Sequence, residues 1–133
     1  MIAVALFAAA HASASDAMPR LTIPELVDRH PELNGHWVEV SGWMGKCRPL
    51  GCVIYADPKS ARTGEDMQDH RNYLSIAAVD HAFDAKAVGL YGRAVALRGR
   101  FDDGCFSPQM ICLDRVADIK PADAKSLMPL KDR

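Results

Sequence analysis

Two segments of the chain alternate between apolar and polar side chains, and this alternation constrains the fold more than any other feature of the sequence. One face of each segment would carry only apolar residues or glycine: Val38, Val40, Gly42 and Met44 in segment 37–44, and Val95, Leu97, Gly99 and Phe101 in segment 94–101. A period of two is typical of a β-strand with one buried face. Gly42, in the middle of the first segment, fits a bulge or sharp bend of the kind that lets a sheet curl into a small barrel.

Shorter segments supply the remaining predicted elements. Three further strands are predicted at 53–56, 73–77 and 110–116. Segment 80–90 suits a short helix, and near the N-terminus Thr22 and Glu25 form a capping box that starts another helix, which Pro31 ends. The predicted order is therefore a helix, three strands, a short helix and two strands.

This order resembles the OB-fold, a five-stranded Greek-key barrel with a helix between its third and fourth strands. Segment 34–44 looks like an OB first strand, and segment 95–101 looks like a fourth; the chain is similar to small exported bacterial OB-like domains. The resemblance implies a mainly β domain over residues 35–120. It also implies that ligands bind beside the loop between strands 1 and 2 and the loop between strands 4 and 5. A fold-level resemblance does not by itself name the ligand.

The first residues of the chain read as a secretory signal peptide. Segment 1–14 carries no charge and is mostly apolar, and two small-x-small cleavage signals end it, at 10–12 and 12–14. The apolar run lacks a preceding Lys or Arg and is too short to span a bilayer. A buried N-terminal helix is the alternative, although the run ends without a helix cap. The leader predicts a periplasmic or extracellular protein with no membrane span.

Length and charge indicate one small domain with two short flanking segments. With 133 residues and a formal net charge of −1, the chain has room for a single core and lacks the surplus of Lys and Arg that drives phosphate binding. Net charge therefore disfavours a nucleic-acid partner. We expect segment 15–34 to hold the short N-terminal helix and segment 121–133 to be a polar tail with little packing.

Four cysteines in an exported domain predict two disulfides. Sequence alone allows three pairings, of which we favour the local ones, Cys47 with Cys52 and Cys105 with Cys112. Under the OB-fold resemblance, these pairs lie in the loops between strands 1 and 2 and between strands 4 and 5, where they would stiffen both borders of the ligand face. The cysteine spacings match neither the paired knuckles of a zinc site nor a Cys-x-x-Cys redox motif.

Aromatic and basic residues predict a ligand-binding face on strands 1 to 3, with stacking rings and a cationic rim. Its residues are Trp37, Trp43, Tyr55 and Tyr73, with Lys46 and Arg48. The alternative is that the two tryptophans pack in the core. A second strip holds the basic residues Arg93, Arg98 and Arg100 beside the acidic residues Asp102, Asp103 and Asp114. We expect these opposite charges to pair with one another.

Segment 57–71 is a polar insert between the second and third strands, and its composition predicts a mobile surface loop. Glu65, Asp66, Asp69 and His70 offer ligands for a divalent cation, but they lack the Asp-x-Asp-x-Asp-Gly register of a calcium loop. Motifs for a serine nucleophile, a phosphate-binding loop and a catalytic zinc are missing as well. We therefore expect no metal, no cofactor and no catalytic residue.

Together these features predict an exported, non-enzymatic binding module that contacts a protein, a glycan or an oligonucleotide. Two alternatives stay open. One is a metal-binding protein or small enzyme that uses the acidic insert or the cysteines. The other is a structural domain that dimerises through the edge of its barrel.

Overall fold

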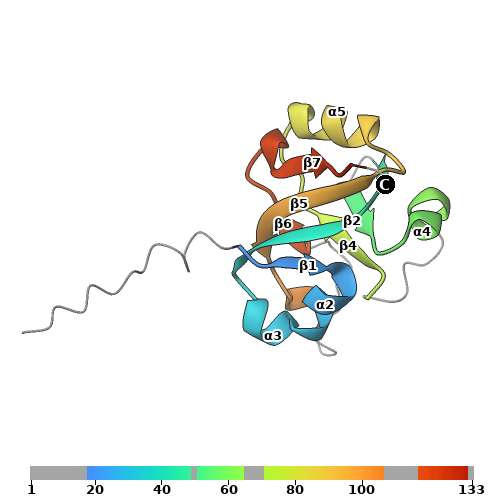
Figure 1. The fold of residues 1–133 in the computed structure, drawn as a ribbon. Coiled ribbons are helices and arrows are strands. Elements are labelled where there is room, and N and C mark those ends of the chain that lie inside the picture. The colour runs from blue at the N-terminus through green and yellow to red at the C-terminus, as the bar shows by residue number, and fades with distance from the viewer. Residues whose placement is uncertain (1–17, 49–50, 65–70, 107–116, 132–133) are drawn as a thin grey trace, which may run out of the picture.

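The computed structural model describes residues 18–48, 51–64, 71–106 and 117–131, apart from the side chain of Arg48 (Figure 1). The strands in these ranges are β1 (Arg20–Thr22), β2 (Trp37–Arg48), β3 (Gly51–Tyr55), β4 (Tyr73–Ile76), β5 (Ala94–Phe101), β6 (Ile119–Lys120) and β7 (Leu127–Pro129). The helices are α2 (Ile23–Asp28), α3 (His30–Leu33), α4 (Pro58–Thr63) and α5 (His81–Gly89), with 3-10 turns η1 (Gly104–Phe106) and η2 (Ala124–Ser126).

Five of these strands close into a barrel. β2, β3 and β4 form an antiparallel meander, β6 pairs in parallel with β4 through Ile76 and Ile119, and β5 pairs with β6 and then with β2. The α5 helix connects the third and fourth strands of this barrel. The strand order, the parallel pair and the helix are those of the OB-fold, so the predicted fold class is confirmed.

The chain ends add one strand to each side of the β2–β5 pair. β1 lies parallel to β2, with Leu21 opposite Val40, and β7 lies antiparallel to β5, with Met128 opposite Ala96. The packing of β7 contradicts the expectation of a loosely packed tail, because Leu127 is fully buried. The apolar run 127–130 is a sequence signal for this strand, but the charged residues before and after it outweighed that signal.

Within the barrel, β2 pairs with two strands along its length. Its first half pairs with β5, its second half pairs with β3, and the register shifts between Met44 and Cys47. The sequence predicted a bulge or bend at Gly42, but the register shift lies further along β2. Gly42 is instead a point of close approach, because a Cβ there would lie 2.6 Å from the Tyr55 carbonyl oxygen. Glycine lets the two strands cross at this distance.

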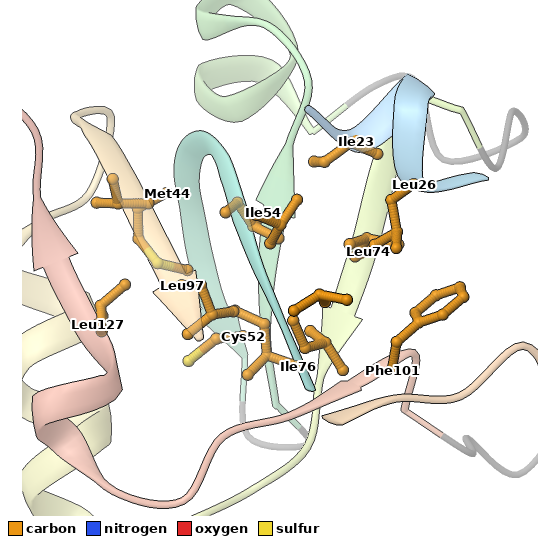
Figure 2. Close-up of a cluster of buried hydrophobic side chains, with 14 of the residues drawn as sticks. Ile23, Leu26, Met44, Cys52, Ile54, Leu74, Ile76, Leu97, Phe101 and Leu127 are labelled. Atoms are coloured by element: carbon orange, nitrogen blue, oxygen red, sulfur yellow. The ribbon is translucent and has the colours of Figure 1, made fainter. Parts of the chain in front are cut away.

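The inward faces of β2 and β5 form the centre of the core, as their alternation predicts. Val38, Val40, Val95, Leu97 and Phe101 are all fully buried. Other elements extend this core on both sides: Figure 2 shows Ile23 and Leu26 of α2 reaching toward Leu74, and Leu127 of β7 beside Leu97 on the other side.

The predicted helices begin as expected. The Thr22 hydroxyl accepts from the Glu25 amide, and the Glu25 carboxylate accepts from the Thr22 amide, so the capping box is present. The α5 helix lies within the predicted segment 80–90, and the Asp80 carboxylate caps it. Pro31 lies in the first turn of α3 rather than ending the preceding helix, which stops at Asp28. Proline fits there because the first turn needs no amide donor.

One further expectation is corrected, and another falls outside the described residues. The first part of the polar insert is the α4 helix, which the Asp57 carboxylate caps and Gly64 ends with a φ of 65°. The predicted fifth strand, 110–116, lies outside the described residues, and the fifth position of the barrel is filled by β6. Capping residues at both ends of a short segment thus outweighed its polar composition.

Candidate functional site

A pocket of about 730 Å³ lies where several barrel strands end. Residues near the start of β2 and β3 and near the ends of β4, β5 and β6 line it: Asn34, Gly35, Gly51, Cys52, Ser75, Ile76, Ala77, Ala78, Arg100, Phe101, Asp102, Ala117 and Lys120. Its volume lies in the range of small-molecule sites, about 300 to 1,000 Å³. Gly51 and Cys52 come from the first cysteine-bearing loop, while Asp102 and Ala117 flank the second. The described ends of both loops therefore border one pocket.

A disulfide fixes the first border of this pocket. Cys47 and Cys52 face each other across the β2–β3 hairpin and are joined by an S–S bond of 2.05 Å. This is the local pairing that the spacing favoured, and it leaves neither sulfur free for the zinc site considered as an alternative. Cys105 is also disulfide-bonded. Cys112, its predicted partner, lies outside the described residues.

Three outward-facing residues form a row from the barrel wall to the pocket. Trp37 of β2 is opposite Arg100 of β5, and Arg100 is opposite Lys120 of β6. All three residues are exposed, and Trp37 is 48% exposed. The Arg100 Nε donates to the Gly35 carbonyl oxygen at 3.2 Å, while within the described ranges the Lys120 ammonium has no hydrogen-bond or ion-pair partner. We refer to Trp37, Arg100 and Lys120 as the cationic row.

A buried carboxylate lies beside this row. Glu39 is only 4% exposed, and its oxygens accept from the Nε atoms of Arg20 on β1 and Arg98 on β5. Burial alone would raise the pKa of Glu39, but the hydrogen bonds from Arg98 and Arg20 outweigh it and hold the pKa below its ordinary value. The ion pairs tie β1, β2 and β5 together on the outer face of the sheet.

The expected pairing of the basic strip with its sequence neighbours is therefore wrong where it can be examined. Arg98 pairs with Glu39 rather than with a nearby aspartate. Asp102 accepts from the Gly104 amide, and Asp103 lies 2.9 Å from the Nδ1 atom of His30. Asp114 lies outside the described residues. Among the described residues, the Arg100 guanidinium donates to the Gly35 carbonyl oxygen through Nε, so its other N–H groups are left for a ligand.

The predicted aromatic face divides into separate groups. Trp43, Tyr55 and Tyr73 are neighbours across β2, β3 and β4, and the Tyr55 and Tyr73 ring centroids are 6.5 Å apart. Tyr55 is only 4% exposed, because it packs with Ala61 of α4 and leaves no room for a side chain at Gly45. In this structure, the Tyr55 ring is therefore not available for stacking with a ligand.

The other predicted face residues lie apart from this cluster. Trp37 belongs to the cationic row, at the other end of the β2–β5 pairing from Trp43. The Lys46 ammonium lies 6.0 Å from the centroid of the Tyr91 ring. Arg48 ends β2 opposite Gly51, which lines the pocket. Of the predicted residues, Trp37, Arg48 and Cys52 are thus placed in or next to the pocket region by strand register.

The sequence analysis did not place Arg100 and Lys120 together at a pocket. The alternation of 94–101 did place Arg100 outward, but the neighbouring aspartates suggested that it was paired. Lys120 could not be found, because the fifth strand was predicted at 110–116.

The acidic insert residues Glu65, Asp66, Asp69 and His70 lie outside the described residues. Within the part of the chain that is described, no three His, Cys, Asp or Glu side chains are placed to hold a metal ion. No helix there has the length and apolar character needed to cross a bilayer.

No protein-family model matches the chain, and no curated protein matches it. Among solved structures, it is similar to an OBody bound to hen egg-white lysozyme, with a TM-score of 0.45 and 14% sequence identity. That match covers 77% of this chain and 89% of the other.

Proposed function

We propose that the protein is an exported, non-enzymatic binding module that receives its partner in the pocket between the two cysteine-bearing loops. The observation that carries this proposal is that Gly51, Cys52, Asp102 and Ala117 border a single pocket. The sequence predicts disulfides in these same two loops, and a leader that would deliver the chain to an oxidising compartment.

The disulfide supports a binding role for the pocket wall. Because Cys47 and Cys52 are joined across the hairpin, the backbone of Gly51 and Cys52 has little freedom to lose when a ligand arrives. A wall that is ordered before binding reduces the entropic cost of association. Bridges placed at the border of a pocket therefore favour affinity as well as stability.

In this proposal the predicted aromatic residues have different roles. Trp37 remains a contact for the partner, since it is exposed next to Arg100. Trp43, Tyr55 and Tyr73 serve to anchor α4 on the sheet, which accounts for the burial of Tyr55. The partner thus contacts the barrel at the strand ends rather than over the middle of strands 2 and 3.

Amide chemical shifts of the 15N-labelled protein test this proposal. One probe represents each predicted partner class: a neutral and an acidic oligosaccharide, an acidic oligopeptide, and a single-stranded oligonucleotide. We expect one of them to produce saturable shifts at pocket residues such as Ser75, Ala77 and Lys120. Shifts confined to the Trp43 and Tyr73 region, or none from any probe, would contradict the pocket assignment.

A pair of matched substitutions sharpens the test. Ala78→Trp places an indole at an exposed residue of the pocket lining and is expected to abolish the saturable shifts. Ala82→Trp makes the same change at an exposed position of α5 outside the lining and should leave them intact. Equal behaviour of the two variants would argue against ligand entry at the pocket.

A further inference from the structure

We propose that the cationic row binds an acidic sugar, with the anionic group between Arg100 and Lys120 and the sugar ring against Trp37. This inference rests on the proposed function, because Arg100 and Lys120 belong to the pocket lining. It adds the chemical class of the ligand and the residues that select it.

The strand register sets the spacing of the three side chains. Trp37, Arg100 and Lys120 occupy one line across β2, β5 and β6. Neighbouring strands lie about 4.8 Å apart, so the row spans about 10 Å. Arg100 and Lys120 are direct neighbours, close enough for both to contact one carboxylate or phosphate group. Trp37 is the next position, where a ring that carries this group would lie.

The charge of the surrounding surface favours an anion. The chain as a whole carries a formal net charge of −1, but four exposed cations, Arg20, Arg98, Arg100 and Lys120, lie on this part of the sheet. The carboxylates beside them are Glu39 and, in the pocket lining, Asp102. Glu39 is occupied by two arginines, and neither belongs to the cationic row. The described pocket lining thus carries two cations, Arg100 and Lys120, against one carboxylate, Asp102, and this excess of positive charge attracts anions at low ionic strength.

The remaining lining provides partners for hydroxyl groups. Asn34 accepts from the Asp103 amide through its Oδ1 atom, which leaves its amide hydrogens as donors at the edge of the pocket. Ser75, Ile76, Ala77 and Ala78 also line the pocket. A pocket with two cations, one carboxylate and an amide suits a ligand that carries hydroxyl groups as well as an anionic group.

The aromatic pattern favours a sugar over a single-stranded nucleic acid. A strand of bases needs successive stacking rings. In the cationic row only Trp37 is aromatic, and the alternative platform is blocked because Tyr55 is buried beside α4. One exposed indole next to two cations fits a single ring with one charged substituent.

Intrinsic fluorescence measures the binding. The chain has two tryptophans, so a Trp43→Phe background reports on Trp37 alone. The carboxylate probe is trigalacturonate with galactotriose as its neutral match, and the phosphate probe is glucose 6-phosphate with glucose as its match. We expect at least one anionic probe to saturate with a Kd at least about tenfold below that of its neutral match, and added salt to weaken it.

Charge-matched variants assign the effect to the row. Arg100→Gln and Lys120→Gln are each expected to weaken the anionic probe about tenfold, whereas Arg93→Gln and Lys125→Gln, exposed and outside the lining, leave it unchanged. Trp37→Ala, followed by amide chemical shifts instead of fluorescence, is expected to weaken binding about fivefold. Because all of these side chains are exposed, thermal unfolding should show little change.

The outcomes separate the two proposals. If only trigalacturonate saturates the site, the ligand is a uronate. If only glucose 6-phosphate saturates it, the ligand is a sugar phosphate. If both do, the site selects its ligand by charge. If neither anionic probe binds better than its neutral match, or if Arg93→Gln acts like Arg100→Gln, the acidic-sugar assignment is wrong. If the oligopeptide or the oligonucleotide then shifts the pocket amides, the proposed binding module still holds. If no probe shifts them, both the binding module and the acidic-sugar assignment are wrong.

Discussion

Glu39 holds together strands that are distant in sequence. Its carboxylate bridges Arg20 and Arg98, and it is almost fully buried between them. Glu39→Gln keeps the shape but removes the charge, and we expect it to lower the free energy of unfolding by about 1 to 2 kcal/mol, since both arginines stay partly hydrated. Urea unfolding at neutral pH measures this value. Glu32→Gln, which removes an exposed ion pair to Arg29, is the control and should have little effect.

The same residue predicts a pH dependence. Because the folded-state pKa of Glu39 is lowered, its stabilising effect is complete above the unfolded-state pKa of about 4.3 and is lost as the pH falls through the folded-state pKa. The stability difference between the native protein and Glu39→Gln should therefore be constant at neutral pH and shrink below about pH 4. A difference that grows on acidification would contradict this reading.

Gly45 is required by a side chain on the neighbouring strand. A Cβ at this position would overlap the Tyr55 ring and lie 2.9 Å from the Val53 carbonyl oxygen. Gly45→Ala should destabilise the protein by about 1 to 3 kcal/mol, because neither β3 nor the buried ring can move freely. Gly89→Ala is the matched control, since nothing lies within 4 Å of its added Cβ. Thermal unfolding of both variants should show a loss for Gly45→Ala alone.

At this scale the sequence predicted which residues of β2 and β5 face the core, because a period of two is a local property. It did not predict that Glu39 is buried on the other face. The partners of Glu39 lie 19 and 59 residues away, and only the closed barrel brings them together. The row of Trp37, Arg100 and Lys120 was hidden for the same reason, as it depends on the register of three separate strands.

Among the elements, β7 shows most clearly what a short strand contributes. It covers β5 beside Leu97, and Leu127 enters the same core as Met44 and Leu97 (Figure 2). Leu127→Ala should cost about 2 to 5 kcal/mol, because it leaves a cavity in a packed site. Lys125→Ala, two residues earlier and exposed, should be close to neutral. Equal midpoints for the two variants in urea would show that β7 is not part of the cooperative unit.

Elements with a capping signal were easier to predict than elements without one. Thr22 marked the start of α2 because its side chain satisfies a first-turn amide locally, whereas α5 was predicted from its apolar residues, although Asp80 caps it in the same way. Asp57 and Gly64 gave the same signal for α4, but the polar composition of the insert obscured it. β6 has only two residues, so its position depends on pairing with Ile76 and Phe101 rather than on any pattern of its own.

For the whole molecule, the bridges add to a barrel that already has a closed core. Cys47→Ala with Cys52→Ala should lower the free energy of unfolding by about 2 kcal/mol, as expected for opening a short loop, while the transition stays cooperative. Intact mass under non-reducing conditions should lie about 4 Da below that of the reduced chain, since each of two bridges removes two hydrogens. A mass about 2 Da lower would mean that only one bridge forms in solution.

The position of β7 also sets the order in which the molecule can be assembled during synthesis. The β2–β3 hairpin is local, so it can form, and its bridge can close, while the rest of the chain is still being made. The β2–β5 pair cannot form before residue 101 has been synthesised. β7, which pairs with β5, is complete only at residue 129. A nascent chain halted between these points would expose the edge of β5 beside Leu97, and would be a target for proteases and for pairing with another chain.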